Sequence, residues 1–344
     1  MLIALPRQHG ATGNEVTAVR HRDGLVRLGH EVLLARLEVS DAALLAREAA
    51  QLAPHVLHLL HAYRTGLPWL EAGLASRYPT VVTLTGTDLY PEVVDPARER
   101  IVTTVLAAVD AVITQNRLAA RALAADRPTL AAKLRYLAPG IALGRAPCPS
   151  LRPPGVGPET PLLLHPAGIR PVKANLELLH LFDPLAEEGL PFALAFCGPV
   201  LDEAYARCLF AALERRPWAY HAGVISPQAM PAALRQADLV LNHSRSEGLP
   251  NALVEAAALG VPVLARDIPG NAAVVEPGVN GLLYEGEESF RREARRLLAD
   301  PGLRRGLCAP RPEGYDPGRE SRELEEIYRG VLERRREQVR GAMG

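Results

Sequence analysis

Short apolar runs alternate with Ala- and Leu-rich stretches along roughly the first 150 residues. Each run has the length of a buried strand, and the stretches between them, the first beginning near Val16, have helical composition. Such alternation predicts parallel strands joined by crossover helices. The predicted strands lie within residues 1–6, 30–37, 54–61, 80–86, 107–115 and 133–139.

A second alternating series follows a break in the pattern. The segment Pro147 to Pro161, PCPSLRPPGVGPETP, is rich in proline and glycine and is typical of an interdomain linker. A helix is predicted from Asn175 to Glu188. The strands of this series are predicted within residues 161–168, 192–198, 219–223, 237–244, 261–267 and 281–284.

The two series predict an α/β protein of two Rossmann-like, doubly wound domains, at residues 1–148 and 160–312. At 344 residues the chain is long enough for each domain to bury its own core. Two such domains facing each other would enclose a cleft, where a small-molecule site is expected. Residues 319–344 follow with the pattern of an amphipathic helix.

Charge and hydropathy exclude several classes of protein. There are 39 basic and 39 acidic residues, so no global field gathers nucleic acid or anionic lipid. The Arg-rich segment Glu333 to Arg340 has the mixed charge of a solvated helix face, although a local basic patch and peripheral membrane association stay open. No apolar stretch reaches ~18 residues, and the chain starts with a strand pattern, so we expect a cytoplasmic protein.

The cysteines do not indicate a metal or redox site. Cys148, Cys197, Cys208 and Cys308 show neither CxxC spacing nor a His partner at zinc-finger distance. We interpret them as reduced thiols.

Residues 247–270, EGLPNALVEAAALGVPVLARDIPG, carry the strongest functional signal. Glu247 lies in the turn before a predicted helix, and Glu255 about two turns along it. Free N–H groups at such a helix start favour phosphate, and a nearby carboxylate can accept hydrogen bonds from ribose hydroxyls. The alternative is that both acids are solvated surface charges. The residues that would form the turn and the helix start are Gly248, Leu249, Pro250 and Asn251.

Positive charge is expected at the same end of the sheet. Arg170 and Lys173 follow a predicted strand and precede a helix, so they suit a diphosphate, unless they are a loose surface pair. Gly168 and Gly198 would let the backbone approach a nucleotide closely, although each also fits a plain turn. No DxD motif occurs in the chain, which fits a site without a metal ion.

A glycine-containing loop follows the first strand. Gly10 and Gly13 lie before the first helix, which Thr12 or Asn14 could cap, and an ordinary strand-to-helix turn is the alternative. The spacing is not the GxGxxG fingerprint and no acidic residue ends the second strand, so a nicotinamide dehydrogenase is disfavoured.

Polar residues end two further strands of the first domain. His61 closes the run PHVLHLLH, whereas His55 and His58 lie earlier and fit satisfied core or edge groups. Asp88 lies beside Thr85 and Thr87. It either orients the hydroxyl group of an acceptor substrate or a neighbouring loop, or it caps a turn. Arg64 fits an anionic acceptor or a surface ion pair equally. The IPGN segment, Ile268 to Asn271, either closes on the site or forms a plain turn.

The segment EGLPNALVEAAALGVPVLA resembles the donor-site signature of the retaining glycosyltransferases of family four, which have the GT-B fold. The resemblance extends over most of the chain and is strongest to the short glycosyltransferase domain-containing proteins, through TGNEVTA, HAYR, TGTD, IRPVK and ARDIPGNAAVV. Selenosugar synthases of the selenoneine pathway share the TGTDLY and IPGN stretches and are the nearest competing identity.

The resemblance implies roles for several of these residues. Glu247 would contact the donor hexose and Glu255 the ribose, while Arg170 and Lys173 would neutralise the diphosphate without a metal. His61 would hydrogen-bond the hexose, and the loop of Gly10, Gly13 and Asn14 would face the donor phosphates. The C-terminal helix would pack back on the first domain, with Tyr328 at a position often aromatic in the family.

We therefore expect a glycosyltransferase that moves a hexose from a nucleotide diphosphate sugar, most simply a UDP-sugar, to an unidentified acceptor. It would retain the anomeric configuration by front-face displacement, since no carboxylate is obviously placed as a covalent nucleophile, and would need neither cofactor nor metal. One alternative is a selenosugar synthase that uses UDP-N-acetylglucosamine and selenophosphate with inversion. Others are a sugar-nucleotide epimerase or hydrolase on the same fold, or a binding module without turnover. The sequence does not indicate the oligomeric state.

Overall fold

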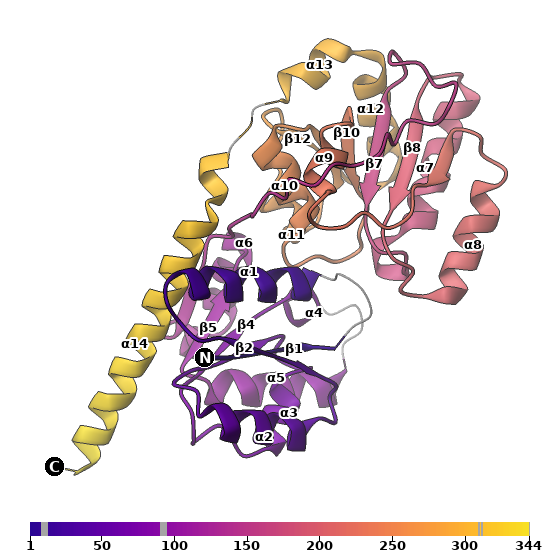
Figure 1. The fold of residues 1–344 in the computed structure, drawn as a ribbon. Coiled ribbons are helices and arrows are strands. Elements are labelled where there is room, and N and C mark those ends of the chain that lie inside the picture. Colours follow the sequence, from indigo (N-terminus) through magenta and orange to yellow (C-terminus); the bar gives the residue numbers. More distant parts are fainter. Residues whose placement is uncertain (8–12, 90–94, 309, 311, 344) are drawn as a thin grey trace. The chain divides into compact units, whose positions relative to one another are not determined.

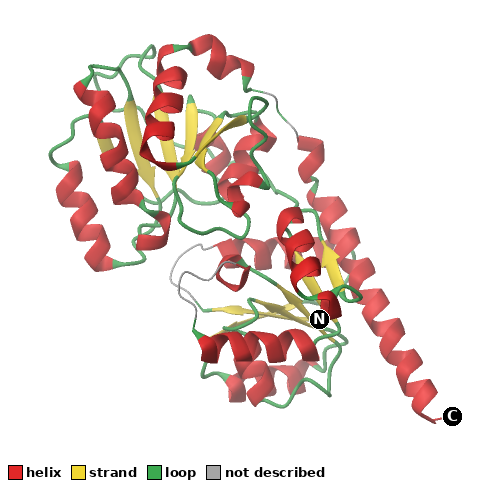
Figure 2. Cartoon of the chain, turned by 180° about the vertical axis from the view of Figure 1, so that it is seen from behind, coloured by secondary structure: helices red, strands yellow, loops and turns green. Residues whose placement is uncertain are grey.

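The chain forms two compact α/β units, each built on one parallel sheet. A computed structural model describes residues 1–7, 13–89, 95–308, 310 and 312–343. Unit 1 comprises Met1–Gly140 and Asp316–Gly344, and unit 2 comprises Ile141–Tyr315 (Figure 1). Figure 2 shows that helices flank the strands in both units, as the alternating pattern predicted. The expectation of two Rossmann-like units is thereby confirmed.

The sheet of unit 1 has six parallel strands in the order β2-β1-β3-β4-β5-β6. The order reverses between β1 and β3, because the chain moves outward to β2 and then returns to the other side of β1. The strands are buried on both faces, which explains their near-continuous apolar composition. Their bounds are β1 Leu2–Pro6, β2 Leu33–Leu37, β3 Leu57–Leu60, β4 Thr80–Thr83, β5 Ala111–Thr114 and β6 Leu134–Tyr136.

Helices cover both faces of this sheet (Figure 1). On one face, Leu45 and Trp69 from α2 and α3 pack with Val105 from α5 against the strands. On the other face, Leu25 of α1 and Tyr328 of α14 join a second core. The helices are α1 Gly13–Arg27, α2 Ala42–Leu52, α3 Gly66–Glu71, α4 Gly86–Leu89, α5 Pro96–Ala108, α6 Arg117–Asp126 and α14 Pro317–Met343, with a 3₁₀ turn at Pro128–Leu130.

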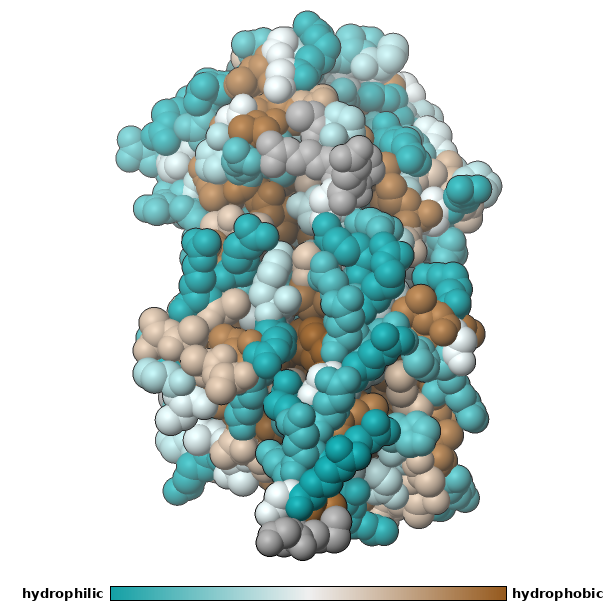
Figure 3. Space-filling view, turned by 90° about the vertical axis from the view of Figure 1, so that its left-hand side faces the viewer, coloured by the Kyte–Doolittle hydropathy of each residue, from teal (hydrophilic) through white to brown (hydrophobic). Residues whose placement is uncertain are grey.

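The long helix α14 returns to unit 1 and is amphipathic. Leu324, Tyr328 and Val331 recur at helical spacing and are almost fully buried in the core of unit 1. Along this helix the molecular surface is predominantly hydrophilic (Figure 3). The exposed face carries Arg322, Glu326, Arg329, Glu333 and Arg336, so the mixed charge of its second half lies on a solvated face.

The sheet of unit 2 also has six parallel strands, in the order β12-β11-β10-β7-β8-β9. Numbered within the unit, this is the order 3-2-1-4-5-6 of dinucleotide-binding folds, with the reversal between β7 and β10. The bounds are β7 Leu162–Pro166, β8 Ala193–Cys197, β9 Ala219–His221, β10 Leu239–Asn242, β11 Val263–Arg266 and β12 Gly281–Tyr284.

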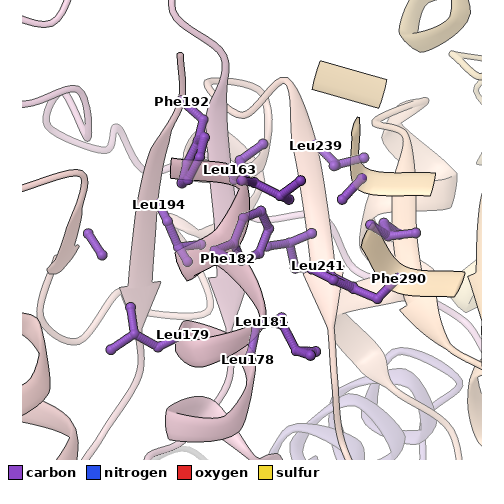
Figure 4. Packing of buried hydrophobic residues seen from close by; sticks show 14 of the residues in the cluster. Leu163, Leu178, Leu179, Leu181, Phe182, Phe192, Leu194, Leu239, Leu241 and Phe290 are labelled. Atoms are coloured by element: carbon purple, nitrogen blue, oxygen red, sulfur yellow. The ribbon is translucent and has the colours of Figure 1, made fainter. Parts of the chain in front are cut away.

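The core of unit 2 on one face of its sheet is centred on Phe182 of α7 (Figure 4). Its ring lies 5.2 Å from that of Phe192 and 5.0 Å from that of Phe290, centroid to centroid. The helices are α7 Asn175–Glu187, α8 Glu203–Leu213, α9 Met230–Leu234, α10 Asn251–Leu259, α11 Pro269–Ala272, α12 Gly286–Ala299 and α13 Pro301–Gly306, with 3₁₀ turns at Pro171–Lys173 and Pro312–Tyr315.

The boundary between the units lies before the predicted linker. Unit 1 ends at Gly140 rather than at Cys148, because the intervening segment is held by unit 2. Ile141 is buried in the unit 2 core and donates its N–H to Tyr315 O at 2.8 Å. The amide of Ala146 donates to Gln228 O at 3.0 Å. The proline-rich segment predicted as a linker is therefore an edge of unit 2.

None of the helices that the structure describes combines the length and the apolar composition needed to cross a membrane.

Candidate functional site

The reversal of strand order in unit 2 brings two functional loops together. Strands β7 and β10 are paired neighbours, although about 70 residues separate them in sequence. The loop after β7 carries Arg170 and Lys173, and the loop after β10 carries Glu247. Helices diverge at such a reversal and leave a crevice at the carboxyl ends of the strands, where open α/β sheets bind ligands.

Lys173 and Glu247 form a largely buried ion pair. Lys173 Nζ lies 2.5 Å from Glu247 Oε1, and the exposed fractions of the two side chains are 17% and 11%. Ser244 Oγ donates to the same carboxylate oxygen at 2.7 Å, and Asn242 Nδ2 at 3.3 Å. This burial is inconsistent with the two alternatives given above, in which Lys173 belongs to a loose surface pair and Glu247 is a solvated surface charge.

Opposing effects determine the pKa of Glu247. Burial raises the pKa of a carboxyl group because the charged form loses hydration. The positive charge of Lys173 and the hydrogen bonds from Lys173, Ser244 and Asn242 outweigh burial and hold the pKa of Glu247 below its ordinary value. At neutral pH the site therefore holds a carboxylate beside an ammonium group.

The IPGN segment packs directly against the Glu247 turn. Asn271 is buried and donates from Nδ2 to Asn242 Oδ1 at 3.2 Å and to Arg266 O at 2.8 Å. A Cβ added at Gly270 would lie 2.3 Å from Glu247 O, so only glycine permits this approach. The segment is therefore part of the structure around Glu247 and not a detached turn.

His165 lies near the carboxyl end of β7, the strand that precedes the loop of Lys173. It is fully buried, and its Nδ1 lies 3.0 Å from Leu241 O. Because a carbonyl oxygen only accepts, Nδ1 carries the proton and Nε2 of the neutral ring has the lone pair. Burial lowers the pKa of His165 to about 4, because the charged ring would lose its hydration. The positive charge of Lys173 also lowers this pKa, whereas the hydrogen bond to Leu241 opposes the shift.

Several buried polar atoms at this edge have unused hydrogen-bonding capacity. Buried polar groups in native proteins normally have hydrogen-bond partners. Several buried polar atoms without a partner at one end of a sheet therefore indicate a binding place for a polar ligand. Among the described residues of unit 2, the buried side-chain atoms without a partner are His165 Nε2, Arg170 Nε, Asn175 Nδ2 and Asn271 Oδ1. All four residues lie at or after the carboxyl ends of β7 and β11.

Helix α10 follows the turn that carries Glu247, as the sequence predicted, but Glu255 lies nearer its start than expected. Helix α10 begins at Asn251, with Pro250 at its N-cap, so Glu255 lies about one turn along it and not two. Gly248, Leu249 and Pro250 form the preceding turn, in which Gly248 and Pro250 are buried. Glu255 nevertheless shares with Glu247 the segment that follows β10. Arg170 precedes the 3₁₀ turn Pro171–Lys173, so it shares with Lys173 the loop after β7.

The two glycines predicted to approach a nucleotide are also needed for packing. Gly198 has φ +148°, and a Cβ there would lie 2.4 Å from Ala167 O. A Cβ at Gly168 would lie 2.6 Å from Leu201 Cδ1. Close contact between the loops after β7 and β8 thus accounts for both residues, and their approach to a nucleotide stays a prediction.

In unit 1, His61 and Asp88 meet at the carboxyl ends of the paired strands β3 and β4. His61 Nδ1 lies 2.8 Å from Asp88 Oδ1, and their side chains are 2% and 0% exposed. His58, three residues earlier within β3, is a satisfied core group, with Nδ1 2.6 Å from Tyr328 OH and Nε2 2.7 Å from Thr83 Oγ1. Those contacts confirm the interpretation of His58 and place Tyr328 inside unit 1.

The glycine-containing loop of unit 1 is only partly described. Helix α1 begins at Gly13, three residues before the predicted start, so Asn14 lies inside its first turn and does not precede the helix as a cap. Gly10 and Thr12 lie outside the described residues. The roles expected for Gly13 and Asn14 therefore stay predictions.

Sequence reasoning did not name three polar residues around the ion pair as site residues: His165, Asn242 and Ser244. A usable signal was present, because His165 and Asn242 are polar residues at the carboxyl ends of otherwise apolar strands. No cluster of three or more His, Cys, Asp or Glu side chains that could hold a metal ion occurs among the described parts of either unit.

Comparison with known proteins decides the family. The sequence model of the family described as Glycosyl transferases group 1 matches residues 152–308, which is nearly all of unit 2. Unit 2 is therefore a domain of this family, and the chain is a glycosyltransferase.

Relatives of this glycosyltransferase include the Glycosyltransferase 1 domain-containing protein 1 of Xenopus tropicalis, which is 28% identical over 321 residues, covering 90% of each chain. A D-inositol 3-phosphate glycosyltransferase of Salinispora arenicola is 39% identical over 81 residues, 23% of this chain and 18% of its own. The first likeness extends through both units, whereas the second is local.

Solved structures show that the glycosyltransferase has the GT-B fold. Anabaena HepE, in complex with UDP and glucose, matches with a TM-score of 0.72 at 18% identity over 96% of this chain and all of its own. Sucrose-phosphate synthase of Thermosynechococcus elongatus matches with a TM-score of 0.74 at 17% identity over 99% of both chains.

Proposed function

We propose that this glycosyltransferase moves a hexose from a UDP-sugar to a nucleophilic acceptor, with retention of the anomeric configuration and without a metal ion. The observation that carries the proposal is the buried Lys173–Glu247 pair at the strand-order reversal of unit 2, beside buried polar atoms that lack partners. Solved complexes of the similarly folded HepE with UDP and with UDP-glucose support the choice of donor.

The donor's parts match different groups at this edge. Arg170 and Lys173 would bind the diphosphate, together with the free N–H groups at the start of α10. Glu247 would accept hydrogen bonds from the hexose, and Glu255 from the ribose hydroxyls. Such charged hydrogen bonds are among the strong ones in proteins, which suits a polyhydroxylated anionic donor.

The reaction requires one bond to break and one to form. The bond from the sugar C1 to the phosphate oxygen breaks, the acceptor oxygen bonds to C1 on the same face, and the acceptor proton passes to the departing phosphate oxygen. Negative charge grows on that phosphate as the bond stretches. Arg170 and Lys173 stabilise that charge more in the transition state than in the ground state, and they take the place of a metal ion.

Isothermal titration with UDP, GDP and ADP tests the site. We expect UDP to bind, and Glu255→Ala to weaken it by on the order of 1–3 kcal/mol through loss of ribose hydrogen bonds. The matched control is Glu187→Ala, at the exposed end of α7 on the opposite edge of the sheet, which should leave the affinity unchanged. Equal affinity of the Glu255→Ala variant and the wild type would remove the ribose role.

Turnover separates a transferase from other enzymes that use the same donor. UDP-glucose is incubated with and without a panel of hydroxyl acceptors, in buffer with EDTA, and products are followed by NMR of the anomeric proton. Acceptor-dependent formation of a retained glycoside supports the proposal. Consumption of UDP-glucose at the same rate without any acceptor would indicate a hydrolase, and an isomerised UDP-sugar an epimerase. Loss of turnover in EDTA would contradict metal independence.

A further inference from the structure

Arg266 is a partly buried cation for which the structure describes no partner. It ends β11 at the carboxyl edge of the sheet of unit 2. Its side chain makes neither a hydrogen bond nor an ion pair with any residue that the structure describes. Other arginines of the chain with limited exposure pair with an acid, as Arg216 does with Asp183 and Arg335 with Asp110. A guanidinium group that has lost part of its hydration normally has an acceptor, so Arg266 indicates a ligand from outside the chain.

The strands on either side place two rings next to Arg266. β11 lies between β10 and β12, Arg266 pairs in register with Tyr284, and His243 follows the last paired residue of β10. Side chains alternate along a strand, so Arg266 shares a face with Leu264, and His243 with Leu241. Both leucines and Tyr284 belong to the core that α7 and α12 cover. Arg266 therefore lies in a row with His243 and Tyr284 at one edge of this face.

The two rings hold each other and carry no charge. His243 Nδ1 lies 2.6 Å from Tyr284 OH, and the ring planes are inclined by 17° with their centroids 5.9 Å apart. Burial raises the pKa of Tyr284, whereas burial, with His165 and Arg266 as further causes, lowers the pKa of His243 to about 4. Both rings are therefore neutral at pH 7, and neither supplies a counter-charge for Arg266.

The neighbouring carboxylates do not neutralise Arg266 either. Glu177 is an acid whose charge reaches this row, but its Oε1 lies 2.5 Å from Arg245 Nη2, and its Oε2 accepts from Tyr205 OH at 2.5 Å. Asp267 follows Arg266 in the chain, yet no ion pair joins the two among the described contacts. The positive charge of Arg266 is therefore uncompensated within the described part of unit 2.

Hydrogen bonds connect Arg266 to the candidate donor site. Its carbonyl accepts from Asn271 Nδ2 at 2.8 Å, and the same amide group donates to Asn242 Oδ1 at 3.2 Å. Asn242 in turn donates to Glu247 Oε1 at 3.3 Å. The uncompensated charge of Arg266 therefore belongs to the carboxyl edge, at which open α/β sheets bind their ligands.

We propose that Arg266 binds a carboxylate or phosphate group of a substrate, in addition to the diphosphate assigned to Arg170 and Lys173. A guanidinium group donates two parallel hydrogen bonds to either kind of anion, which favours such an anion over a neutral hydroxyl group. The inference rests on the proposed function, because that function brings substrates to this edge. The acidic group comes from one of two substrates, the sugar of the donor or the acceptor.

Isothermal titration with two donors tests the first source. UDP-glucuronic acid differs from UDP-glucose only by a carboxylate in place of the C6 hydroxymethyl group. If the donor carries the acidic group, we expect the wild type to bind UDP-glucuronic acid about 10-fold or more tightly than UDP-glucose, because of the charged hydrogen bonds. Arg266→Gln should abolish this preference, and Arg266→Lys, which keeps the charge but not the planar group, should keep part of it.

Proton NMR with inorganic phosphate tests the second source. The protein is saturated with UDP, so that phosphate does not occupy the diphosphate site, and the ring signals of His243 are assigned with His243→Gln. If the acceptor carries the acidic group, the two donors should bind equally, and phosphate should shift the His243 signals in a saturable way. Arg266→Gln should weaken this phosphate binding about 10-fold or more.

A matched arginine separates a local effect from a change in net charge. Arg235 is exposed at the end of α9, before β10 and so at the opposite, amino-terminal edge of the sheet. None of the described residues pairs with its side chain. Arg235→Gln should therefore leave both titrations unchanged.

The outcomes distinguish this inference from the proposed function. A preference for UDP-glucuronic acid that persists in Arg266→Gln, or a phosphate shift that persists there, would contradict the role of Arg266. A wild type that binds UDP but shows neither effect would overturn the inference alone, even if Arg266→Gln did not fold. A wild type that binds no UDP would overturn the proposed function and this inference with it.

Discussion

Glu247 and Glu320 both stay ionised although little of either side chain is exposed to water. At Glu247 the charge belongs to the candidate donor site, whereas Glu320 at the start of α14 is structural. Arg20 Nε donates to Glu320 Oε2 at 2.7 Å, and His21 Nε2 lies 3.2 Å from Oε1. Burial raises the pKa of Glu320, but Arg20 and His21 outweigh burial and lower it to about 2.

Removal of the Glu320 charge should destabilise unit 1. A pKa of about 2 in place of 4.5 corresponds to about 3 kcal/mol of folding stability at pH 7, and Glu320→Gln also leaves Arg20 unpaired. Because the folded-state pKa is depressed, this contribution is full above about pH 4.5 and is lost as the pH falls toward 2. Urea unfolding at several pH values should therefore show a gap between wild type and variant that narrows in acid.

The control for this substitution lies on the same helix. Glu323 pairs with Arg319 at 3.5 Å with 39% of its side chain exposed, so Glu323→Gln should change stability by less than about 1 kcal/mol. If both substitutions lowered the free energy of unfolding by the same amount, the buried contacts of Glu320 would contribute no more stability than the exposed pair of Glu323.

Sequence alone could identify Glu247 and Lys173 but not most of their partners. The Glu247 signal is local, since the turn and the helix that follow it are contiguous in the chain. The partners of Glu320 lie about 300 residues away, and His61 and Asp88 meet only because β3 and β4 pair. Contacts of this kind depend on strand order, which local patterns do not encode.

At the scale of elements, the prediction was most accurate where periodicity is regular. Helix α7 was expected from Asn175 to Glu188 and spans Asn175–Glu187, and the twelve strands that the structure describes lie within the predicted runs. Errors fall at turns: α1 starts early, and the proline-rich segment belongs to unit 2. Short-range backbone hydrogen bonds and close packing decide such boundaries, and apolar periodicity does not report them.

The contact between the loops after β10 and β11 gives a test at this scale. In Gly270→Ala the new Cβ would meet Glu247 O at 2.3 Å, so one of the two backbones must move. We expect a loss of about 1–3 kcal/mol of stability and weaker UDP binding, because the displaced turn carries Glu247.

Thermal unfolding and UDP titration measure the two effects. Gly306→Ala at the end of α13 is the control, since nothing lies within 4 Å of its Cβ position. That substitution should be nearly neutral in both measurements. Unaltered UDP affinity in Gly270→Ala would show that the position of the Glu247 turn does not matter for the donor.

At the scale of the whole molecule, the two units differ in continuity. Unit 2 is a single segment, Ile141–Tyr315, with its own two cores. Unit 1 is assembled from two segments, and α14 supplies Leu324, Tyr328 and Val331 to one of its cores. The sequence predicted this return of the chain only through the family resemblance, because an isolated amphipathic helix does not reveal where it packs.

Expression of parts of the chain should reveal this difference. We expect residues 141–315 to fold cooperatively alone, because no segment of its cores is missing. Residues 1–315 should show the unit 2 transition in calorimetry but lack that of unit 1, whose core loses the three buried apolar side chains of α14. A native-like unit 1 transition in the shortened chain would show that α14 is dispensable for the stability of that unit.

The discontinuity of unit 1 also affects how the protein matures on the ribosome. Residues 1–140 leave the exit tunnel first, yet the helix that completes their core is translated only after all of unit 2. Residues 1–140 therefore keep apolar surface exposed until α14 has been synthesised. Unit 2 contains all of its core residues and can fold before unit 1 is complete. Chaperone capture during synthesis should accordingly concentrate on the first 140 residues.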